Sequence, residues 1–338
     1  MQRDSGRVAV IVGLGLIGGS IALRLIAQNW TVFGFDPDHA TQEAMAANGI
    51  DVLLSLNDIS SLSPNVVIVA GPIWSIPELL KSLAQLKTLD CTVVEVGSVK
   101  SGVIAVLEHL DSDFIRRFVP VHPMAGKESS GFGNASETLL TNVPWALILD
   151  SGASIEHVLY VLTFLNQEFS ARVHPLDTNG HDESVALISQ LPHLLANALL
   201  AAVGESPRSR SAFALAAGSF RDGTRVAGSA PKRTAAMVFD NREALVTPAT
   251  QVACEIIAAG MELRQNRNIN LFERASRARE QFEVFTALHN QKSTIVIHRE
   301  GLLKTLMGLG EDGSSVELVS VNGDDYEFVL SGGGELGE

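Results

Sequence analysis

Two residues at the ends of apolar runs are candidates for acid–base chemistry. His122 follows the run FVPV and precedes a loop rich in glycine and serine, and Ser98 follows the run TVVEVG. An imidazole with an ordinary pKa near ~6.5 can accept a proton at neutral pH, and loops on a rigid scaffold often carry function. We therefore predict that His122 is catalytic rather than structural. Ser98 is either a site residue or the N-cap of the helix that follows it.

A polar stripe lies on a predicted helix further along the chain. Ser189, Gln190, His193 and Asn197 are one, three and four residues apart among Leu, Ala, Ile and Val. This spacing places them on one helix face. Pro192 should kink the helix, because it removes a backbone hydrogen bond and leaves a carbonyl without its donor. The stripe is either part of a ligand site or a hydrogen-bonded network in the core.

Arg221 and Arg225 form a local basic cluster in the segment FRDGTRVAGSAP. A guanidinium binds a carboxylate through two parallel hydrogen bonds. In a chain with a net charge of −13, such a cluster is predicted to receive an anionic group of a ligand. The alternative is that the arginines pair with nearby acids such as Asp222.

A glycine-rich loop near the start of the chain indicates a dinucleotide site. The sequence Gly13-Leu14-Gly15-Leu16-Ile17-Gly18 follows an apolar run at residues 8–12 and precedes a helical pattern. Gly13 permits the tight turn, Gly15 lets the backbone approach a pyrophosphate, and Gly18 lets helix and strand pack closely. Asp36 lies 23 positions after Gly13, near the expected ~20. Its carboxylate would accept hydrogen bonds from a ribose and repel a 2′-phosphate, which favours NAD over NADP.

The elements that position these residues fall into three parts. Up to residue 176, short β-branched runs alternate with amphipathic stretches, which is typical of a doubly wound α/β sheet of the Rossmann type with buried parallel strands. Residues 177–290 have helical periodicity and predict an all-α domain. Residues 291–338 contain three strand-like runs and an Asn322-Gly323 turn, so we expect a β-containing appendix with a disordered end.

Composition excludes several classes of protein. Two cysteines in 338 residues cannot build a disulfide framework, which fits a reducing cytoplasm. The acidic balance disfavours nucleic acid as a partner. Arg3 and Arg7 before an apolar run imitate a signal peptide, but glycines interrupt the run. No uninterrupted apolar stretch has the ~20 residues that span a bilayer, so we expect a soluble cytoplasmic protein.

Taken together, these motifs resemble the prephenate and arogenate dehydrogenases of tyrosine biosynthesis. The segments GLGLIGGS, VGSVK, HPMAGKESSG, HDESVALISQLPH and FRDGTRVAGSAP occur in the order and at the spacing of that family, over residues 8–288. The resemblance implies a Rossmann domain that binds NAD and a helical domain that forms a homodimer. It also implies oxidative decarboxylation of a small-molecule substrate, either prephenate to 4-hydroxyphenylpyruvate or arogenate to tyrosine.

The resemblance also implies residue roles. His122 matches the histidine that deprotonates the C4 hydroxyl, Ser98 a serine that positions it, and Glu128 an acidic residue near the entrance. His193 matches a substrate-binding histidine and Arg225 the arginine that holds a substrate carboxylate, with Arg221 as a second candidate. The chain departs from the family's usual residues at four positions: Glu95, Gln190, Thr234 and Ala236.

Two other functions remain open from the residues alone. A β-hydroxyacid dehydrogenase or imine reductase also joins a Rossmann domain to a helical one, but it usually uses a lysine base, and residues 181–231 contain no lysine. A non-catalytic NAD-sensing protein could keep the fold, but it would not need Ser98, His122 and Arg225 together.

Overall fold

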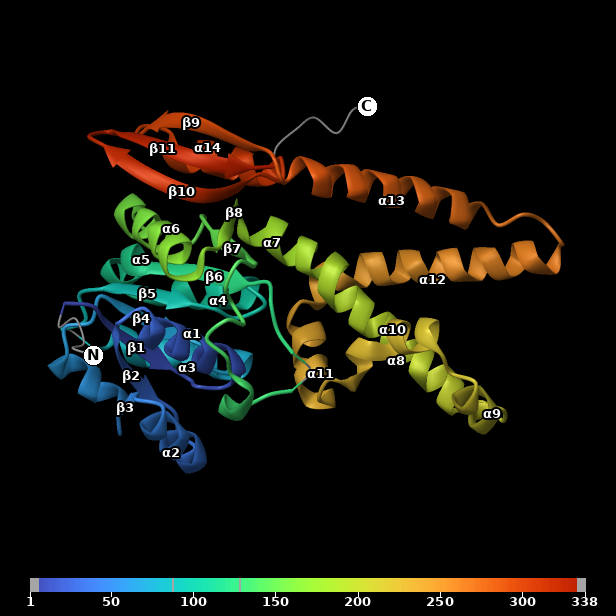
Figure 1. The fold of residues 1–338 in the computed structure, drawn as a ribbon, viewed down its shortest axis with the longest axis horizontal. Helices are drawn as coiled ribbons and strands as arrows, with labels where there is room; N and C mark the ends of the chain where they lie inside the picture. The colour runs from blue at the N-terminus through green and yellow to red at the C-terminus, as the bar shows by residue number, and fades with distance from the viewer. Residues whose placement is uncertain (1–5, 87, 128, 333–338) are drawn as a thin grey trace. The chain divides into compact units, whose positions relative to one another are not determined.

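The chain folds into two compact units. A computed structural model describes residues 6–86, 88–127 and 129–332. The first unit contains the described residues up to His181 and those from Glu283 onward, and the second is Asp182–Phe282 (Figure 1). The chain therefore leaves the first unit near residue 181 and returns to it near residue 283.

An 11-stranded sheet organises the first unit, in the order β3-β2-β1-β4-β5-β6-β7-β8-β10-β11-β9. Its strands are β1 (Val8–Val12), β2 (Thr31–Phe35), β3 (Asp51–Val52), β4 (Val66–Val69), β5 (Thr92–Glu95), β6 (Phe118–Pro123), β7 (Pro144–Ile148), β8 (Arg172–Leu176), β9 (Lys292–His298), β10 (Ser315–Asn322) and β11 (Asp325–Ser331). The six strands from β3 to β6 are parallel, and β7 runs antiparallel to β6. From β1 the chain proceeds to β2 on one side and later to β4 on the other, which is the kind of switch point where such sheets bind ligands.

Helices flank the strands of this unit. They are α1 (Leu16–Ala27), α2 (His39–Ala47), α3 (Ile76–Ala84), α4 (Ser101–Leu107), α5 (Ser112–Arg117), α6 (Ile155–Phe169) and α14 (Leu302–Glu311). Short helical turns add η1 (Leu56–Ser61), η2 (Ile73–Ser75) and η3 (Phe132–Asn134). The predicted doubly wound α/β class is confirmed.

The apolar core of the first unit forms two clusters, because successive side chains of a strand point to opposite faces of the sheet. Ala9 and Ile11 of β1 join an apolar cluster with α1 and α6, whereas Val10 and Val12 join a second cluster with α3. Successive side chains of a strand point to opposite faces, so continuous apolar runs are buried on both sides. This explains why the central strands are apolar throughout instead of alternating with polar residues.

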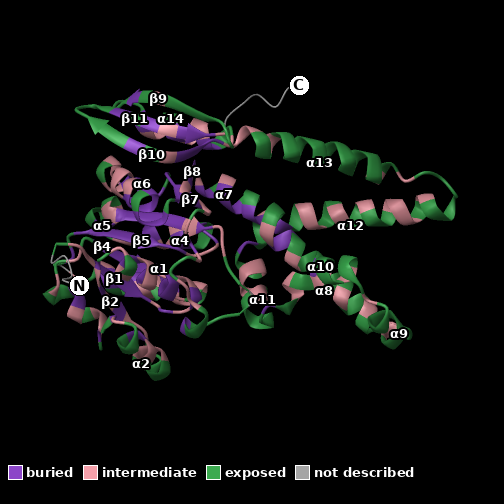
Figure 2. Cartoon of the chain, in the orientation of Figure 1, coloured by how far each residue is buried: buried purple, intermediate pink, exposed green. Residues whose placement is uncertain are grey.

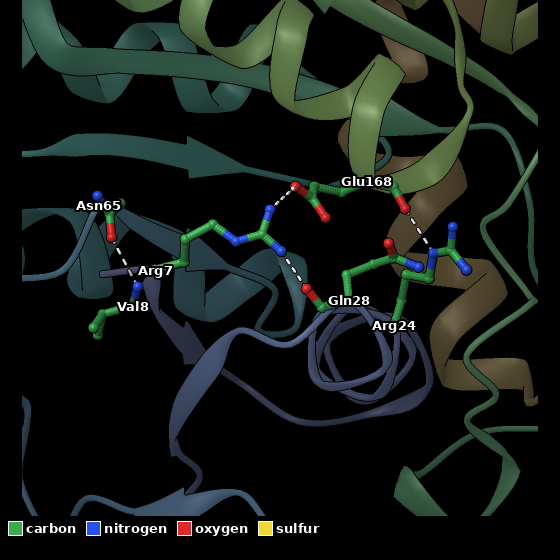
Figure 3. A network of polar contacts seen from close by, with 6 residues as sticks. All are labelled: Arg7, Val8, Arg24, Gln28, Asn65 and Glu168. Atoms are coloured by element: carbon green, nitrogen blue, oxygen red, sulfur yellow. Dashed lines mark hydrogen bonds and ion pairs between the residues drawn. The ribbon is translucent and has the colours of Figure 1, made fainter. Parts of the chain in front are cut away.

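A polar network fixes the start of β1 (Figure 3). Arg7 donates to Glu168 Oε1 at 2.9 Å and to the Gln28 carbonyl. Arg24 Nε donates to the Glu168 carbonyl at 2.6 Å. Glu168 is 4% exposed, so a charge-assisted bond satisfies a buried carboxylate. The network joins the beginning of β1 to the ends of α1 and α6.

The C-terminal segment extends the sheet instead of standing apart. Strand β10 pairs with β8 through Val316 and Val173, and then with β11, which pairs with β9. The predicted Asn322-Gly323 turn lies in the β10–β11 hairpin. At the junction with β8, Lys292 and Glu317 form an ion pair beside a cavity of about 450 Å³. The segment closes a sheet edge that would otherwise expose unpaired backbone groups. The predicted disorder at the end falls on residues 333–338, outside the described residues.

The second unit is helical, as expected. It continues α7 (Thr178–Val185) through a π-helical turn, η4 (Ala186–Gln190), into α8 (Leu191–Gly204). The rest comprises α9 (Ser209–Ala214), α10 (Gly218–Thr224), η5 (Arg225–Gly228), α11 (Pro231–Asp240), α12 (Arg242–Arg264) and the first part of α13 (Asn270–Leu288).

The helical unit leaves much apolar surface exposed. Its buried apolar residues are few, with Ala186, Leu191 and Leu245 at the centre. Figure 2 shows exposed and intermediate residues along α12, where Ile256, Ile257 and Met261 are more than half exposed. The helices Thr178–Gly204 and Arg242–Arg264 are long and apolar enough to span a membrane by length and composition alone, although charged residues interrupt the sequence of the second. Exposed apolar surface of this kind is typical of an interaction site.

Candidate active site

The glycine loop has the geometry that its spacing predicts. Gly13 has φ 91°, and a Cβ there would stand 2.6 Å from the backbone nitrogen of Gly71. At Gly18 a Cβ would stand 1.9 Å from the Gly13 carbonyl oxygen, whereas at Gly15 it would meet nothing within 4 Å. Two glycines are therefore needed for packing inside the protein, and the third leaves open space beside the loop.

The N-terminus of α1 faces that loop. Gly15 is its N-cap and supplies no side-chain hydrogen bond, and Leu16 and Ile17 are its first residues. The first N–H groups of a helix have no partners within the helix, and they favour an anion. The residues present therefore fit the pyrophosphate of a dinucleotide.

Asp36 lies directly after β2, beside the same loop. Its carboxylate accepts from the backbone N–H of Leu14 at 2.8 Å and of Asp38 at 3.0 Å, one bond to each oxygen. Each oxygen retains a lone pair, so the carboxylate can still accept a ribose hydroxyl. Asp38 and His39 follow, both exposed, and neither offers a fixed positive charge to a 2′-phosphate.

A buried ion pair supports the loop that carries Ser98. Glu95 and Lys100 are both 0% exposed, and Lys100 Nζ lies 2.7 Å from Glu95 Oε2. Glu95 also accepts from the N–H of Gly97, and Lys100 donates to the Val121 carbonyl at 2.6 Å. The pair thus joins the residue before Ser98 to the residue before His122. Helix α4 has Lys100 as its N-cap, so the N-cap alternative for Ser98 is wrong.

His122 lies half-buried near the end of β6, and its ring contacts a second histidine. His122 Nδ1 is 3.0 Å from Nε2 of His181, with ring centroids 5.2 Å apart and planes at 69°. Burial, then the neighbouring His181 and Lys100, lower the pKa of His122 well below its ordinary value. The imidazole is therefore neutral at pH 7 and can act as a base.

His181 is a site residue that the sequence analysis missed. It lies on α7 and is 1% exposed. It belongs to the segment HDES, but spacing along the chain does not reveal that its ring contacts a residue of a strand 59 residues earlier. The packing is non-local, so the only signal available was a histidine at the start of a polar helical turn.

The residues of the predicted polar stripe have different surroundings in the helical unit. Gln190 is 0% exposed, and its Oε1 accepts from Asn241 Nδ2 at 2.8 Å. The core-network alternative is thus confirmed for Gln190. His193 is half-buried, and its Nδ1 lies 2.9 Å from the Ser189 carbonyl. A carbonyl only accepts, so Nδ1 carries a proton and Nε2 is left for a ligand. Asn197 is exposed and donates to the His193 carbonyl.

The arginine cluster lies on the surface of the helical unit. Arg221 lies in the last turn of α10 and Arg225 begins η5, and both side chains are exposed. The segment η5 packs against α8, so Arg225 and His193 lie on neighbouring elements of one unit. Thr234 and Ala236, two of the departures from the family pattern, are half-buried on α11. Glu128 lies outside the described residues.

The first unit therefore collects four predicted site features at the carboxyl edge of its sheet. The glycine loop follows β1, Asp36 follows β2, Ser98 follows β5, and His122 lies at the end of β6. The helical unit holds His193 and Arg225. Among the described residues no cluster of His, Cys, Asp and Glu could hold a metal ion.

Comparisons with known proteins give consistent matches. The family model for the nucleotide-binding domain of prephenate dehydrogenase matches residues 20–174, and the model for its dimerization domain matches residues 177–275. The cyclohexadienyl dehydrogenase of Zymomonas mobilis is 31% identical over 243 residues, which cover 70% of this chain and 81% of that protein. The prephenate dehydrogenase of Lactococcus lactis is 27% identical over 330 residues, which cover 95% and 90%.

A solved structure shares the fold. The prephenate dehydrogenase of A. aeolicus, in complex with hydroxyphenyl propionate and NAD+, superimposes with a TM-score of 0.73 at 24% identity. The match covers 84% of this chain and 100% of that one. The C-terminal segment after residue 275 lies outside both family models.

Proposed function

The chain belongs to the prephenate dehydrogenase family, and on that premise we propose that it converts prephenate to 4-hydroxyphenylpyruvate and carbon dioxide with NAD as oxidant. The observation that carries the proposal is the place of His122 at the carboxyl edge of the sheet, with its Nδ1 3.0 Å from Nε2 of the buried His181. The base stands on the same sheet edge as the glycine loop, which is what hydride transfer next to proton transfer requires.

The cofactor assignment rests on the glycine loop and Asp36. The open space at Gly15, the uncapped N-terminus of α1 and the acidic end of β2 fit a dinucleotide with an unphosphorylated ribose. NAD would accept the hydride from C4 of the substrate. The A. aeolicus enzyme, which has this fold, was crystallised with NAD+.

His122 and Ser98 act on the C4 hydroxyl of the substrate, His122 as the base and Ser98 as a hydrogen-bonding group. His122 takes this proton as the hydride leaves C4 and a carbonyl forms there, while Ser98 hydrogen-bonds the same oxygen and orients it. Carbon dioxide then leaves from C1, and the electron pair of the broken bond makes the ring aromatic with the negative charge on the C4 oxygen. His122 returns the proton to that oxygen, so the reaction neither consumes nor releases a proton.

A base with a low pKa suits a reaction in which the same group first removes a proton and later returns it. The surroundings that lower the pKa of His122 keep it deprotonated before the reaction and make its protonated form a good acid afterwards. Aromatisation supplies much of the driving force, so the protein mainly has to orient substrate and cofactor.

Recognition of the substrate depends on a few local groups. Prephenate carries two carboxylates and the chain has a net charge of −13, so long-range electrostatic repulsion opposes binding. Arg225 supplies a guanidinium for one carboxylate and His193 a ring nitrogen for substrate, with Arg221 one helical turn away from Arg225. For Glu128, which lies outside the described residues, the proposed role of an acidic residue near the entrance of the site rests on the family resemblance alone.

We assign the exposed apolar faces of the helical unit to a homodimer. The family model that covers residues 177–275 is a dimerization domain, and the exposed side chains of α12 supply the apolar surface that a stable interface needs. A buried dimer face accounts for the length and hydropathy of the helices Thr178–Gly204 and Arg242–Arg264 without a membrane. An enzyme of this kind would work in the cytoplasm.

Turnover measurements test the function. The purified chain is mixed with NAD and either prephenate or arogenate, and NADH is measured together with the aromatic product. We expect NADH and 4-hydroxyphenylpyruvate in a one-to-one ratio, with a larger kcat/KM for prephenate than for arogenate. A preference for arogenate would move the assignment to the arogenate branch of the family. Absence of turnover with both would contradict the proposal and leave the NAD-sensing alternative.

A further inference from the structure

The contact between His122 and His181 contains a single proton that could belong to either ring. A neutral imidazole has one N–H donor and one acceptor nitrogen. In the 3.0 Å contact between His122 Nδ1 and His181 Nε2, one nitrogen must donate and the other accept. The two arrangements have opposite consequences for His122. If Nδ1 donates, Nε2 carries the lone pair; if Nδ1 accepts, Nε2 carries the proton and cannot act as a base.

We propose that His181 is a positioning residue whose Nε2 accepts the Nδ1–H of His122, which fixes His122 in the tautomer that presents an unprotonated Nε2 to the substrate hydroxyl. The proposal rests on the proposed function for the identity of the reacting hydroxyl. His181 itself does not touch substrate or cofactor in this role. It acts through His122, as a buried orienting group does for a catalytic histidine elsewhere.

Burial makes the arrangement rigid. His181 is 1% exposed and sits in helix α7, whose backbone holds it through the bond from its own N–H to the Asp177 carbonyl at 3.0 Å. The ring planes of the two histidines meet at 69°, and the two facing nitrogens are 3.0 Å apart, within hydrogen-bond distance. A phenylalanine would fill the same space without the acceptor, which separates packing from positioning.

The charges around His122 explain why a neutral partner is useful. His181 faces its ring from α7, and Lys100 acts on it from the loop after β5, with Glu95 paired to Lys100. An aspartate in place of His181 would stabilise the imidazolium and raise the pKa of His122. A neutral acceptor fixes the tautomer without that effect, so the proton taken from the hydroxyl is easily returned to the product.

Three variants test the proposal. His181→Phe removes the acceptor and keeps the ring, His181→Gln keeps an acceptor, and His181→Asp makes the acceptor an anion. The matched control is His157→Phe, which alters a partly buried histidine of the same unit. Its Nδ1 lies 2.8 Å from the hydroxyl of Thr92. For each variant we would measure kcat, KM, the pH dependence of kcat, thermal unfolding, and the ring-nitrogen NMR shifts of His122, assigned by their loss in His122→Asn.

The expected results differ between variants. His181→Phe should lower kcat about 10-fold to 100-fold with little change in KM, because the base is misaligned and partly in the wrong tautomer. His181→Gln should recover most of that loss. His181→Asp should move the acidic limb of the pH profile to higher pH by about one unit or more. In the wild type, NMR should report a protonated Nδ1 and an unprotonated Nε2 on His122.

Two outcomes would overturn the proposal. One is an NMR spectrum in which Nε2 of His122 carries the proton in the neutral wild type. The other is a folded His181→Phe variant whose kcat and pH profile match those of the wild type. The NMR result does not depend on turnover, so a wild-type chain that fails to oxidise prephenate would contradict the proposed function and still leave the tautomer testable.

Discussion

The buried pair Lys100–Glu95 gives a prediction that links stability to catalysis. Lys100→Met removes the positive charge from a site where both side chains are 0% exposed and keeps a side chain of similar length. Glu95 would remain buried and lose its partner. At 2.7 Å between Lys100 Nζ and Glu95 Oε2, the attraction is about 6 kcal/mol with an effective dielectric constant of ~20.

The cost of removing both charges from water offsets much of that attraction. The net contribution of the pair to the free energy of unfolding must therefore be measured by comparing variants. We expect Lys100→Met to lower the free energy of unfolding by about 3–5 kcal/mol, because it leaves an uncompensated buried charge. The double variant Glu95→Gln/Lys100→Met should lose less than the sum of the single variants by at least ~2 kcal/mol. Lys81→Met, which breaks an exposed ion pair with Glu78, should cost less than ~1 kcal/mol.

Urea unfolding measures these free energies, and the pH dependence of kcat measures the second effect. Lys100 contributes to the lowered pKa of His122, so its removal should raise that pKa. Protonation of His122 then begins at higher pH. The acidic limb of the plot of kcat against pH should therefore move to higher pH in both the single and the double variant. A single variant that costs less than ~1 kcal/mol and leaves the limb in place would refute the reasoning.

Three further substitutions test the other assigned roles. Arg225→Ala should raise KM for prephenate by the equivalent of about 2–4 kcal/mol with a smaller effect on kcat; an unchanged KM in steady-state kinetics would move the carboxylate receptor to Arg221. Asp36→Ser should weaken NAD binding and improve the ratio of NADP to NAD affinity in a titration, and an unaltered ratio would exclude Asp36 from ribose recognition. Ile257→Glu places a charge on the exposed apolar face of α12 and should shift the chain to monomer in sedimentation experiments; a dimer of undiminished affinity would place the interface elsewhere.

Local patterns predicted the parts of the site that local sequence can determine. The glycine loop and Asp36 depend on spacing within the unit β1–α1–β2, and the strand-end positions of Ser98 and His122 depend on the apolar runs directly before them, so the sequence was sufficient to predict these positions. The division into a sheet unit and a helical unit was likewise predictable from the hydrophobic periodicity of the sequence.

The missed features all depend on contacts between distant segments. His181 and His122 are 59 residues apart in the chain and meet only in the folded protein. Lys100 reaches the Val121 carbonyl only because β5 and β6 are neighbours. Helix α14 and the pairing of β10 with β8 depend on where the chain returns after the helical unit. Periodicity carries no information about such pairings, since many registers bury the same apolar residues.

The most direct test of the account is the His122→Asn variant, measured for NAD binding and for NADH formation with prephenate in the same preparation. Asparagine keeps a polar side chain at the end of β6 but has no basic nitrogen. We predict that kcat falls about 10²-fold or more while the NAD dissociation constant and the unfolding temperature stay close to the wild-type values. A folded variant that binds NAD and retains nearly normal kcat would contradict the assignment of His122 as the base.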